Sequence, residues 1–528
     1  MSQVFIYDST LRDGAQAQGI SFSVEDKIKI VQRLDELGIS YIEAGNPGSN
    51  PKDMEFFNRV ADLKLKNSKI IAFGSTRKVK AAVEQDKNLL SLLDANTPAV
   101  AIFGKSWDYQ VTDILRTTLD ENLSMISDTI GFLKKNGKEV VFDAEHFFDG
   151  YKANPDYAMQ TLQVAADAGA DTLCLCDTNG GSFPNDVFSI TEKVVKRFKA
   201  QIGIHCHNDS EMAVANSVAA VQAGAVQVQG TINGIGERCG NANLCSIIPN
   251  LQLKLGRLCI PDTSMGHLTS VARYVSEIAN AAFNEKAAYV GNDAFSHKGG
   301  MHIDAVSKNP ISYEHINPEV VGNARHILVS EVAGRSALLA KINQVDASLT
   351  KDSAETKHIL DHLKDMEHEG YQFESAESSF QLLVRKLLGK HKPFFDLREY
   401  KVNIHEPAVN GMNSSVIIKI AVDGQEEVTA AEGDGPVNAL DKAVRKALEH
   451  FYPAISEIKL TDYKVRVLDS DQASAAKVRV LIESRDQHES WTTIGVSTDI
   501  IDASWHALID SIEYKLVRDQ ERLAFSGT

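Results

Sequence analysis

The sequence contains few cysteines, and their spacing does not suggest a disulfide framework. Six cysteines occur among 528 residues, all of them before residue 260. No Cys-x-x-Cys pair is present. So small a number of thiols is typical of a protein that keeps them reduced, and we expect a cytoplasmic location.

An excess of basic residues and a long apolar run are also missing. The chain has 55 Lys and Arg residues against 71 Asp and Glu residues, a net charge of −16. This balance argues against a nucleic-acid partner and against an anionic membrane surface, whereas small anionic ligands remain compatible with it. No stretch is long and apolar enough to span a bilayer. Val4 opens a strand-like segment without a basic and apolar leader before it, so we expect no secretion signal.

The first half of the chain alternates short β-branched segments with amphipathic helical ones, such as 24–37 and 155–168. We expect strands to begin at Val4, Tyr41, Lys69, Ala99, Glu139, Thr172, Ile202 and Val226. Eight strand–helix units of this length predict a closed (β/α)8 TIM barrel, an α/β fold. A doubly wound open sheet is the alternative, but the first turn lacks its Gly-x-Gly-x-x-Gly sequence.

The rest of the chain predicts two further parts, because 528 residues are too many for one core. We expect the barrel over 1–262, helical linker subdomains over 263–392, with helices at 271–283 and 346–364, and a C-terminal domain over 393–528. In that domain a group of strands followed by a helix occurs twice, which predicts an α+β fold with an internal repeat. It holds no cluster of ligands or nucleophiles, so small-molecule sensing or dimerisation suits it better than catalysis.

Polar residues follow nearly every expected strand of the barrel. Catalytic groups of TIM barrels lie just beyond the C-terminal ends of the strands. The segments found there are 8–16, 43–45, 73–77, 143–146, 176–180, 203–209 and 233–241. A helix cap or a turn explains any one of them. Seven of eight strand ends are hard to explain in this way, and we expect the active site at this mouth of the barrel.

Two histidines, His205 and His207, stand near the end of the seventh expected strand. Because strand side chains alternate, both point to one face and can share a metal ion. Such a pair taken alone is as often a hydrogen-bonded part of a core. Asp13, beyond the first strand, offers a carboxylate, and Asn241, beyond the eighth, a carbonyl oxygen. This set leaves coordination positions open and suits Zn²⁺, Mn²⁺, Co²⁺ or Mg²⁺, without choosing among them.

These groups suit chemistry on a 2-oxo acid. A metal ion can hold the ketone and carboxylate oxygens of such an acid and polarise the ketone. Arg12 can stabilise the negative oxygen that forms when the ketone is attacked, and Thr178 can hydrogen-bond to the carboxylate. Farther along, His297 and His302 flank a Gly-Gly break within 294–304. That segment is interpreted equally well as a surface loop and as a loop that presents imidazoles.

Four motifs together resemble the DRE-TIM metallolyase superfamily: Leu11-Arg12-Asp13-Gly14, Ile42-Glu43-Ala44-Gly45, His205-Cys206-His207-Asn208-Asp209 and Gly234-Ile235-Gly236-Glu237-Arg238-Cys239-Gly240-Asn241. Within it the chain resembles the 2-isopropylmalate, homocitrate and citramalate synthases, which condense acetyl-CoA with a 2-oxo acid. Segment 432–440 is similar to the C-terminal regulatory domain of the 2-isopropylmalate and citramalate synthases, which binds the end-product amino acid. Segments 13–16, 103–108, 143–150 and 370–374 resemble most the citramalate branch, whose acceptor is pyruvate.

The resemblance implies a homodimeric acyltransferase that forms (R)-citramalate and CoA in isoleucine biosynthesis, with isoleucine as the feedback ligand. It also implies a role for each matching residue. Asp13, His205 and His207 would bind the metal, with Asn241 as the fourth ligand. Arg12 would stabilise the developing alkoxide, Glu43 would orient Arg12, and Gln16, Glu145 and Thr178 would line the 2-oxo acid site. His302 would be the base that deprotonates acetyl-CoA, with Tyr313 beside it, whereas His297 receives no definite role.

Three alternatives are compatible with the sequence. The first keeps the chemistry but changes the acceptor to 2-oxoisovalerate, as in a 2-isopropylmalate synthase of leucine biosynthesis, or to 2-oxoglutarate. One methylene in a hydrophobic pocket is worth only about 1–3 kcal/mol, so the sequence separates these acceptors poorly. The second is a metal-dependent C–C lyase, against which the long regulatory domain argues. The third is an amino-acid sensor with an inactive barrel, which the intact polar motifs disfavour.

Overall fold

A computed structural model describes residues 2–327, 339, 342–343, 345–346, 348–350, 353–373, 376–409, 412–468, 476–486 and 489–526. The chain divides into two compact units. The barrel unit comprises Met1–Ser296 and Glu314–His326, and the second unit comprises His297–Tyr313 and Ile327–Thr528. Among the described residues, no helix has the length and apolar character needed to cross a membrane.

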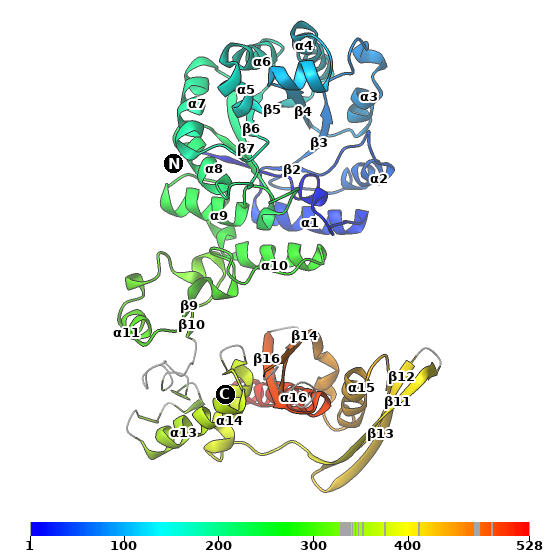
Figure 1. The fold of residues 1–528 in the computed structure, drawn as a ribbon, viewed down its shortest axis with the longest axis vertical. Helices are drawn as coiled ribbons and strands as arrows, with labels where there is room; N and C mark the ends of the chain where they lie inside the picture. The colour runs from blue at the N-terminus through cyan, green and yellow to red at the C-terminus, as the bar shows by residue number, and fades with distance from the viewer. Residues whose placement is uncertain are drawn as a thin grey trace. The chain divides into compact units, whose positions relative to one another are not determined.

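The barrel unit contains the predicted closed barrel of eight parallel strands (Figure 1). The strands are β1 (Phe5–Asp8), β2 (Tyr41–Glu43), β3 (Lys69–Ser75), β4 (Ala99–Lys105), β5 (Glu139–Glu145), β6 (Thr172–Asp177), β7 (Gln201–Cys206) and β8 (Gln227–Gly230). Each strand pairs with the next, and β1 closes the ring by pairing with β8 from Phe5 to Asp8. Every strand begins within one residue of the position expected from the sequence. The open doubly wound sheet is therefore wrong.

Helices cover the outside of the barrel in the order expected for strand–helix units (Figure 1). They are α1 (Val24–Leu37), α2 (Pro51–Val60), α3 (Lys87–Asp94), α4 (Leu119–Lys135), α5 (Phe147–Ala153), α6 (Pro155–Asp167), α7 (Pro184–Arg197), α8 (Ala213–Gln222), α9 (Leu244–Pro249) and α10 (Leu268–Ile278). The first helix shows how adjacent residues set its limits. A capping box between Ser23 and Asp26 starts α1, and Gly38, with φ of 93°, stops it in the left-handed region.

Short helical turns complete the connections between these elements. In the barrel unit they are η1 (Gly14–Gln16), η2 (Val83–Gln85), η3 (Gln110–Ile114), η4 (Ile232–Gly234), η5 (Asn250–Lys254), η6 (Asp262–His267), η7 (Asn292–Phe295) and η9 (Pro318–Val321). The two-residue strands β9 (Ser296–His297) and β10 (His326–Ile327) lie at the boundary of the two units in the sequence. The turn η1, which follows β1, carries part of the candidate site described below.

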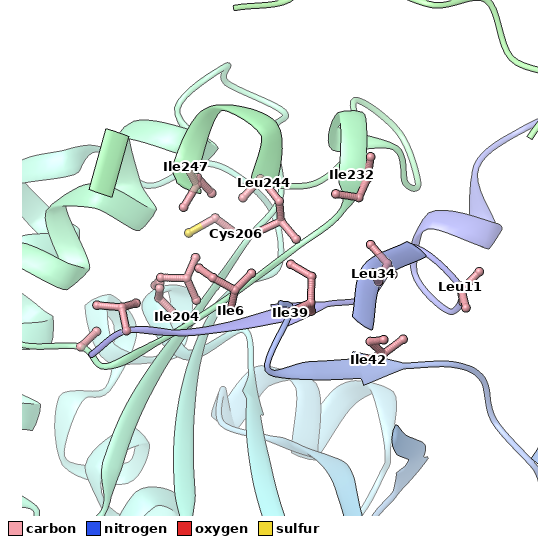
Figure 2. Packing of buried hydrophobic residues seen from close by; sticks show 14 of the residues in the cluster. Ile6, Leu11, Leu34, Ile39, Ile42, Ile204, Cys206, Ile232, Leu244 and Ile247 are labelled. Atoms are coloured by element: carbon pink, nitrogen blue, oxygen red, sulfur yellow. The ribbon is translucent and has the colours of Figure 1, made fainter. Parts of the chain in front are cut away.

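Strand side chains alternate between two separate cores. Ile6, Ile42 and Ile204 point away from the barrel axis and pack with helix residues such as Leu34 and Leu244 (Figure 2). The alternate positions face the interior and form a smaller cluster of Tyr7, Tyr41, Ile71, Ala99, Ala101, Val141, Cys174 and Cys176. This largely apolar cluster fills much of the barrel interior below the C-terminal ends of the strands.

The second unit contains the predicted internal repeat. Its helices and strands are α11 (Gly300–Lys308), η8 (Pro310–Ser312), α13 (Ala354–Glu369), α14 (Glu377–Leu387), β11 (Asp396–Val409), β12 (Met412–Val422), β13 (Gln425–Gly433), α15 (Pro436–Leu448), η11 (Pro453–Glu457), β14 (Lys459–Val467), β15 (Val478–Arg485), β16 (Ser490–Ser497) and α16 (Ile500–Ser526). Two antiparallel three-stranded sheets form, β11-β12-β13 and β14-β15-β16. A helix follows each sheet, α15 after the first and α16 after the second (Figure 1).

One helix of the second unit differs from the sequence prediction. The helix expected over 346–364 is α13, and it begins at Ala354 rather than at Asp346. The carboxylate of Asp346 accepts hydrogen bonds from the backbone N–H and the hydroxyl of Ser348. This local turn competes with helix formation, as short polar side chains commonly do. The expected start of this helix was wrong because the spacing of apolar residues alone does not reveal such turns.

Candidate active site at the mouth of the barrel

Asp13, His205 and His207 meet at the C-terminal end of the barrel. Asp13 precedes η1, His205 lies near the end of β7, and His207 follows that strand. The Oδ2 atom of Asp13 lies 3.7 Å from Nε2 of His205 and 3.9 Å from Nε2 of His207. All three side chains are buried, and one ligand atom from each falls within 4.8 Å of the others. This spacing is that of groups able to surround a single ion.

Asn241 adjoins this trio through the backbone. It forms an antiparallel bridge with His207, and its Nδ2 donates a hydrogen bond to the carbonyl of Ile235 at 3.2 Å. Its Oδ1 is buried and has no hydrogen-bond partner among the described residues. An unpaired buried acceptor is costly unless something binds it. A Cβ at Gly236 would lie 2.2 Å from Nδ2 of Asn241, so only glycine lets the loop approach this closely.

The charge states of the three groups suit a cation. Burial lowers the pKa of His207 to about 4, and the neighbouring His205 adds to this shift. Burial also lowers the pKa of His205, so both imidazoles are neutral at neutral pH. Burial raises the pKa of Asp13, but the Arg12 guanidinium and the histidines outweigh it and bring that pKa to about 2. A carboxylate, two neutral imidazoles and an amide oxygen fit a divalent metal ion.

Arg12 lies beside this trio in a fixed orientation. Its Nε donates to Oε2 of Glu43 at 2.6 Å, and its Nη1 donates to Oδ2 of Asp13 at 3.1 Å. Its guanidinium lies 3.8 Å from the ring centroid of Phe73. Two carboxylates and an aromatic face therefore hold the cation, and the pKa of Arg12 is raised above its usual value, since the ion pairs outweigh burial.

Glu43 is fully buried, and two further residues hold it. The hydroxyl of Tyr7 donates to its Oε1 at 2.7 Å, and the hydroxyl of Ser9 donates to its Oε2. Ser9 Oγ also accepts a hydrogen bond from the backbone N–H of Asp13 at 3.2 Å. Neither Tyr7 nor Ser9 was predicted from the sequence to have a role in the site. A polar residue at an inward position of β1 was the only available signal for Tyr7.

A cavity of about 270 Å³ opens beside these groups. Its lining includes three more residues that the resemblance implied, Gln16, Glu145 and Thr178. The Oγ1 of Thr178 accepts a hydrogen bond from the backbone N–H of His146 at 2.8 Å, and Oε2 of Glu145 lies 2.5 Å from the ammonium of Lys105. The remaining lining residues are Arg12, Asp13, Phe73, Phe103, Asp143, Cys176, His205, His207, Glu237 and Arg238.

Arg238 connects three of the loops around the cavity. Its Nε and Nη2 donate to the carboxylate of Asp209 at 2.7 and 2.9 Å, and Nη2 also donates to the carbonyl of Thr178 at 2.7 Å. Arg238 has a φ of 54°, a conformation that a non-glycine residue adopts only when its surroundings hold it. The loops after β6, β7 and β8 are therefore fixed to one another at the mouth.

The remaining predicted site residues belong to the second unit. His302 lies on α11 and Tyr313 follows η8, and their rings stack with centroids 4.0 Å apart and planes 24° apart. Both side chains are exposed, whereas His297 is buried. The structure thus brings His302 and Tyr313 together with each other. In the barrel, seven of the nine predicted residues line one cavity, and the other two, Glu43 and Asn241, contact the lining residues Arg12 and His207.

Three family models match successive segments of the chain. Residues 3–275 match the model of the HMGL-like family. Residues 289–371 match the Homocitrate synthase post-HMGL domain-like family, and residues 374–516 match the LeuA allosteric (dimerisation) domain. These matches confirm the fold class and the resemblance inferred from the sequence motifs.

Full-length relatives narrow the family. The chain is 54% identical to an (R)-citramalate synthase of Aquifex aeolicus, over 98% of this chain and 99% of the relative. It is 53% identical to an (R)-citramalate synthase of Geobacter sulfurreducens, over 99% of each chain. A 2-isopropylmalate synthase of Methanocaldococcus jannaschii is 31% identical over 98% of this chain and 96% of its own. This chain belongs to the (R)-citramalate synthase family of HMGL-like proteins.

Proposed function

We propose that this protein condenses acetyl-CoA with pyruvate and hydrolyses the thioester, giving (R)-citramalate and CoA for isoleucine biosynthesis. The observation that carries this proposal is identity above 50% along the whole chain with two proteins named (R)-citramalate synthase. The buried Asp/His/His site at the barrel mouth supplies the means for such chemistry. The chain is then an acyltransferase.

We propose that Asp13, His205, His207 and Asn241 hold a divalent metal ion, either Mn²⁺, Zn²⁺, Co²⁺ or Mg²⁺. A bound ion of this kind polarises the ketone of a 2-oxo acid. The neutral imidazoles, the ionised carboxylate and the unpaired amide oxygen of Asn241 support this assignment. In the same proposal, Gln16, Glu145 and Thr178 line the place of the 2-oxo acid beside these ligands.

Arg12 and its support by Glu43 suit the bond-forming step. When the acetyl carbon attacks the ketone carbon, the π electrons move onto the ketone oxygen, which becomes negative. Arg12 lines the cavity and remains a cation, so it stabilises that charge. Glu43 keeps the guanidinium in place through the hydrogen bond of 2.6 Å. The charge of Glu43 is in turn satisfied by Tyr7 and Ser9, away from the cavity.

Replacing Arg12 tests this role. A lysine ammonium in Arg12→Lys cannot contact Glu43, Asp13 and the Phe73 ring together, so we expect kcat to fall about 10²–10³-fold. Release of the CoA thiol is the measurement. Arg77→Lys is the matched control, because Arg77 is also buried and paired with two carboxylates but does not line the cavity. Unchanged kcat in Arg12→Lys would remove Arg12 from the mechanism.

The base that removes a methyl proton from acetyl-CoA is, in this proposal, His302, assisted by Tyr313. The exposed, stacked imidazole supports this role because a general base must be open to its substrate. The subsequent attack of water on the thioester carbonyl releases CoA as a thiol and leaves a carboxylate. Each proton taken up by the base is returned to the alkoxide or to the medium, so the base is regenerated.

The acceptor is tested with a panel of 2-oxo acids. The rings of Phe73 and Phe103 stack in the cavity lining with centroids 5.4 Å apart. We expect CoA release to be fastest with pyruvate and slower with 2-oxobutyrate, 2-oxoisovalerate and 2-oxoglutarate. A clear preference for 2-oxoisovalerate would make the protein a 2-isopropylmalate synthase. The lower identity to such an enzyme, 31%, favours the first result.

Regulation and assembly follow from the C-terminal part of the chain. The match to the LeuA allosteric (dimerisation) domain over 374–516 supports a regulated dimer. We propose a homodimer that binds isoleucine in this domain. We also propose that the chain comprises three parts, the barrel over 1–262, helical linker subdomains over 263–392 and the regulatory domain over 393–528. CoA release measured with isoleucine and with leucine separates the two possible feedback ligands.

A cytoplasmic location belongs to the same proposal, supported by cysteines that are all unpaired thiols.

A further inference from the structure

A chain of two hydrogen bonds leads from the candidate metal ligands into the barrel. The Nδ1 of His205 and the Oε1 of Gln229 are 3.1 Å apart, and the Nε2 of Gln229 donates to Oδ1 of Asp143 at 2.8 Å. His205 and Gln229 are neighbours across β7 and β8, whereas Asp143 comes from β5. All three side chains are buried; Gln229 is 1% exposed.

The donors and acceptors in these two hydrogen bonds determine which nitrogen of His205 carries the hydrogen. In the structure, the amide nitrogen of Gln229 donates to Oδ1 of Asp143, and the amide oxygen of Gln229 faces His205. That oxygen only accepts, so Nδ1 of His205 carries the hydrogen. A neutral imidazole has one N–H, which leaves a lone pair on Nε2. This atom is the one that faces Asp13, at 3.7 Å.

His207 provides an internal contrast. Its Nδ1 is buried and has no hydrogen-bond partner among the described residues. Of the two histidines, His205 is thus the one whose ring orientation and hydrogen position are set by a hydrogen bond to Nδ1, the nitrogen that faces away from Asp13. Gln227 provides a second contrast, since it lies two residues from Gln229 on β8. Its side-chain amide is buried and likewise has no partner among the residues described.

We propose that Asp143 and Gln229 are positioning residues that hold His205 with its Nε2 lone pair directed at the metal. This inference rests on the metal site of the proposed function. Groups that bond to the far nitrogen of a metal-binding histidine fix its tautomer and its orientation before the metal binds. The protein then does not have to select one of two tautomers and one of several ring orientations during binding.

The test measures metal binding by the metal-free full-length protein. Free Mn²⁺ is followed by electron paramagnetic resonance during a titration. We expect Gln229→Leu to weaken Mn²⁺ binding about 10–100-fold, because leucine offers no acceptor to Nδ1. Gln227→Leu is the matched control: the same substitution on the same strand, also buried, without contact to a histidine. We expect it to change the affinity less than about 3-fold.

A double variant separates positioning from general disruption of the barrel interior. In Gln229→Glu with Asp143→Asn, the carboxylate introduced at position 229 accepts from both the amide introduced at position 143 and Nδ1 of His205, so the lone pair stays on Nε2. We expect this variant to recover most of the lost Mn²⁺ affinity. Equal Mn²⁺ affinities of the wild-type protein and Gln229→Leu would overturn only the positioning role of Gln229 and Asp143. Absence of Mn²⁺ binding by the wild-type protein would overturn both the proposed metal site and this positioning role.

Discussion

His207→Ala is expected to bind the divalent ion weakly and to lose CoA release with pyruvate by roughly 10³–10⁴-fold. The Lewis-acid contribution of a metal to a polarised carbonyl is several kcal/mol, which corresponds to this factor. His207 is chosen because it contacts neither Arg12 nor Glu43, so the charged pair of the site remains intact in the variant. Metal content of the purified protein and turnover are both measured.

The control for this variant is His267→Ala, which removes an exposed histidine of the same unit. It is expected to retain metal and activity. Because His207 is buried, far-ultraviolet circular dichroism and a thermal melt check that the barrel still folds. A His207→Ala protein with full metal content and wild-type turnover would contradict the proposed ligand set. Loss of metal with retained turnover would contradict the role of the metal instead.

His302→Ala is expected to lower kcat about 10²–10⁴-fold, the range for loss of a general base. The KM for acetyl-CoA should change little, because the imidazole is proposed to act on the methyl proton rather than to bind the thioester. Exchange of the acetyl methyl protons with deuterated water, measured without pyruvate, reports on the same step. Both measurements use the full-length protein.

Two variants of the same segment sharpen this prediction. Met301→Ala changes the preceding residue, which is 82% exposed and cannot accept a proton, and it is expected to leave kcat unchanged. Tyr313→Phe keeps the ring that stacks on His302 at 4.0 Å and removes only the hydroxyl. A lower kcat in Tyr313→Phe would show that the hydroxyl assists the base. A wild-type kcat in this variant would show that Tyr313 only supports the ring of His302. Near-normal turnover in His302→Ala would remove this imidazole from the mechanism.

Local patterns in the sequence predicted most of the barrel. The helix expected over 24–37 has the limits of α1, which a capping box and a terminal glycine set, and these are properties of a few adjacent residues. The facing of His205 and His207 followed from the alternation along one strand. Such features require no knowledge of what lies across the barrel, so they can be inferred from a single chain.

Partners from distant strands could not be predicted in this way. Gln229 and Asp143 are 86 residues apart and meet because the register of the closed barrel brings β5, β7 and β8 to one level. The sequence shows only that Gln227 and Gln229 are polar residues at alternate positions of a buried strand, which does not say which of them finds a partner. The network around Glu43 depends in the same way on Tyr7 from the neighbouring strand.

The internal repeat of the second unit has a consequence for how that unit unfolds. Its two three-stranded sheets and their helices do not have separate interiors. Ile418 of the first repeat and Ile482 of the second belong to one hydrophobic cluster, and the ring of Tyr400 lies 5.5 Å from that of Trp505 across the repeats. Neither half can expose its apolar face without exposing that of the other. Amide hydrogen exchange should therefore show that both repeats open together, in a single cooperative transition.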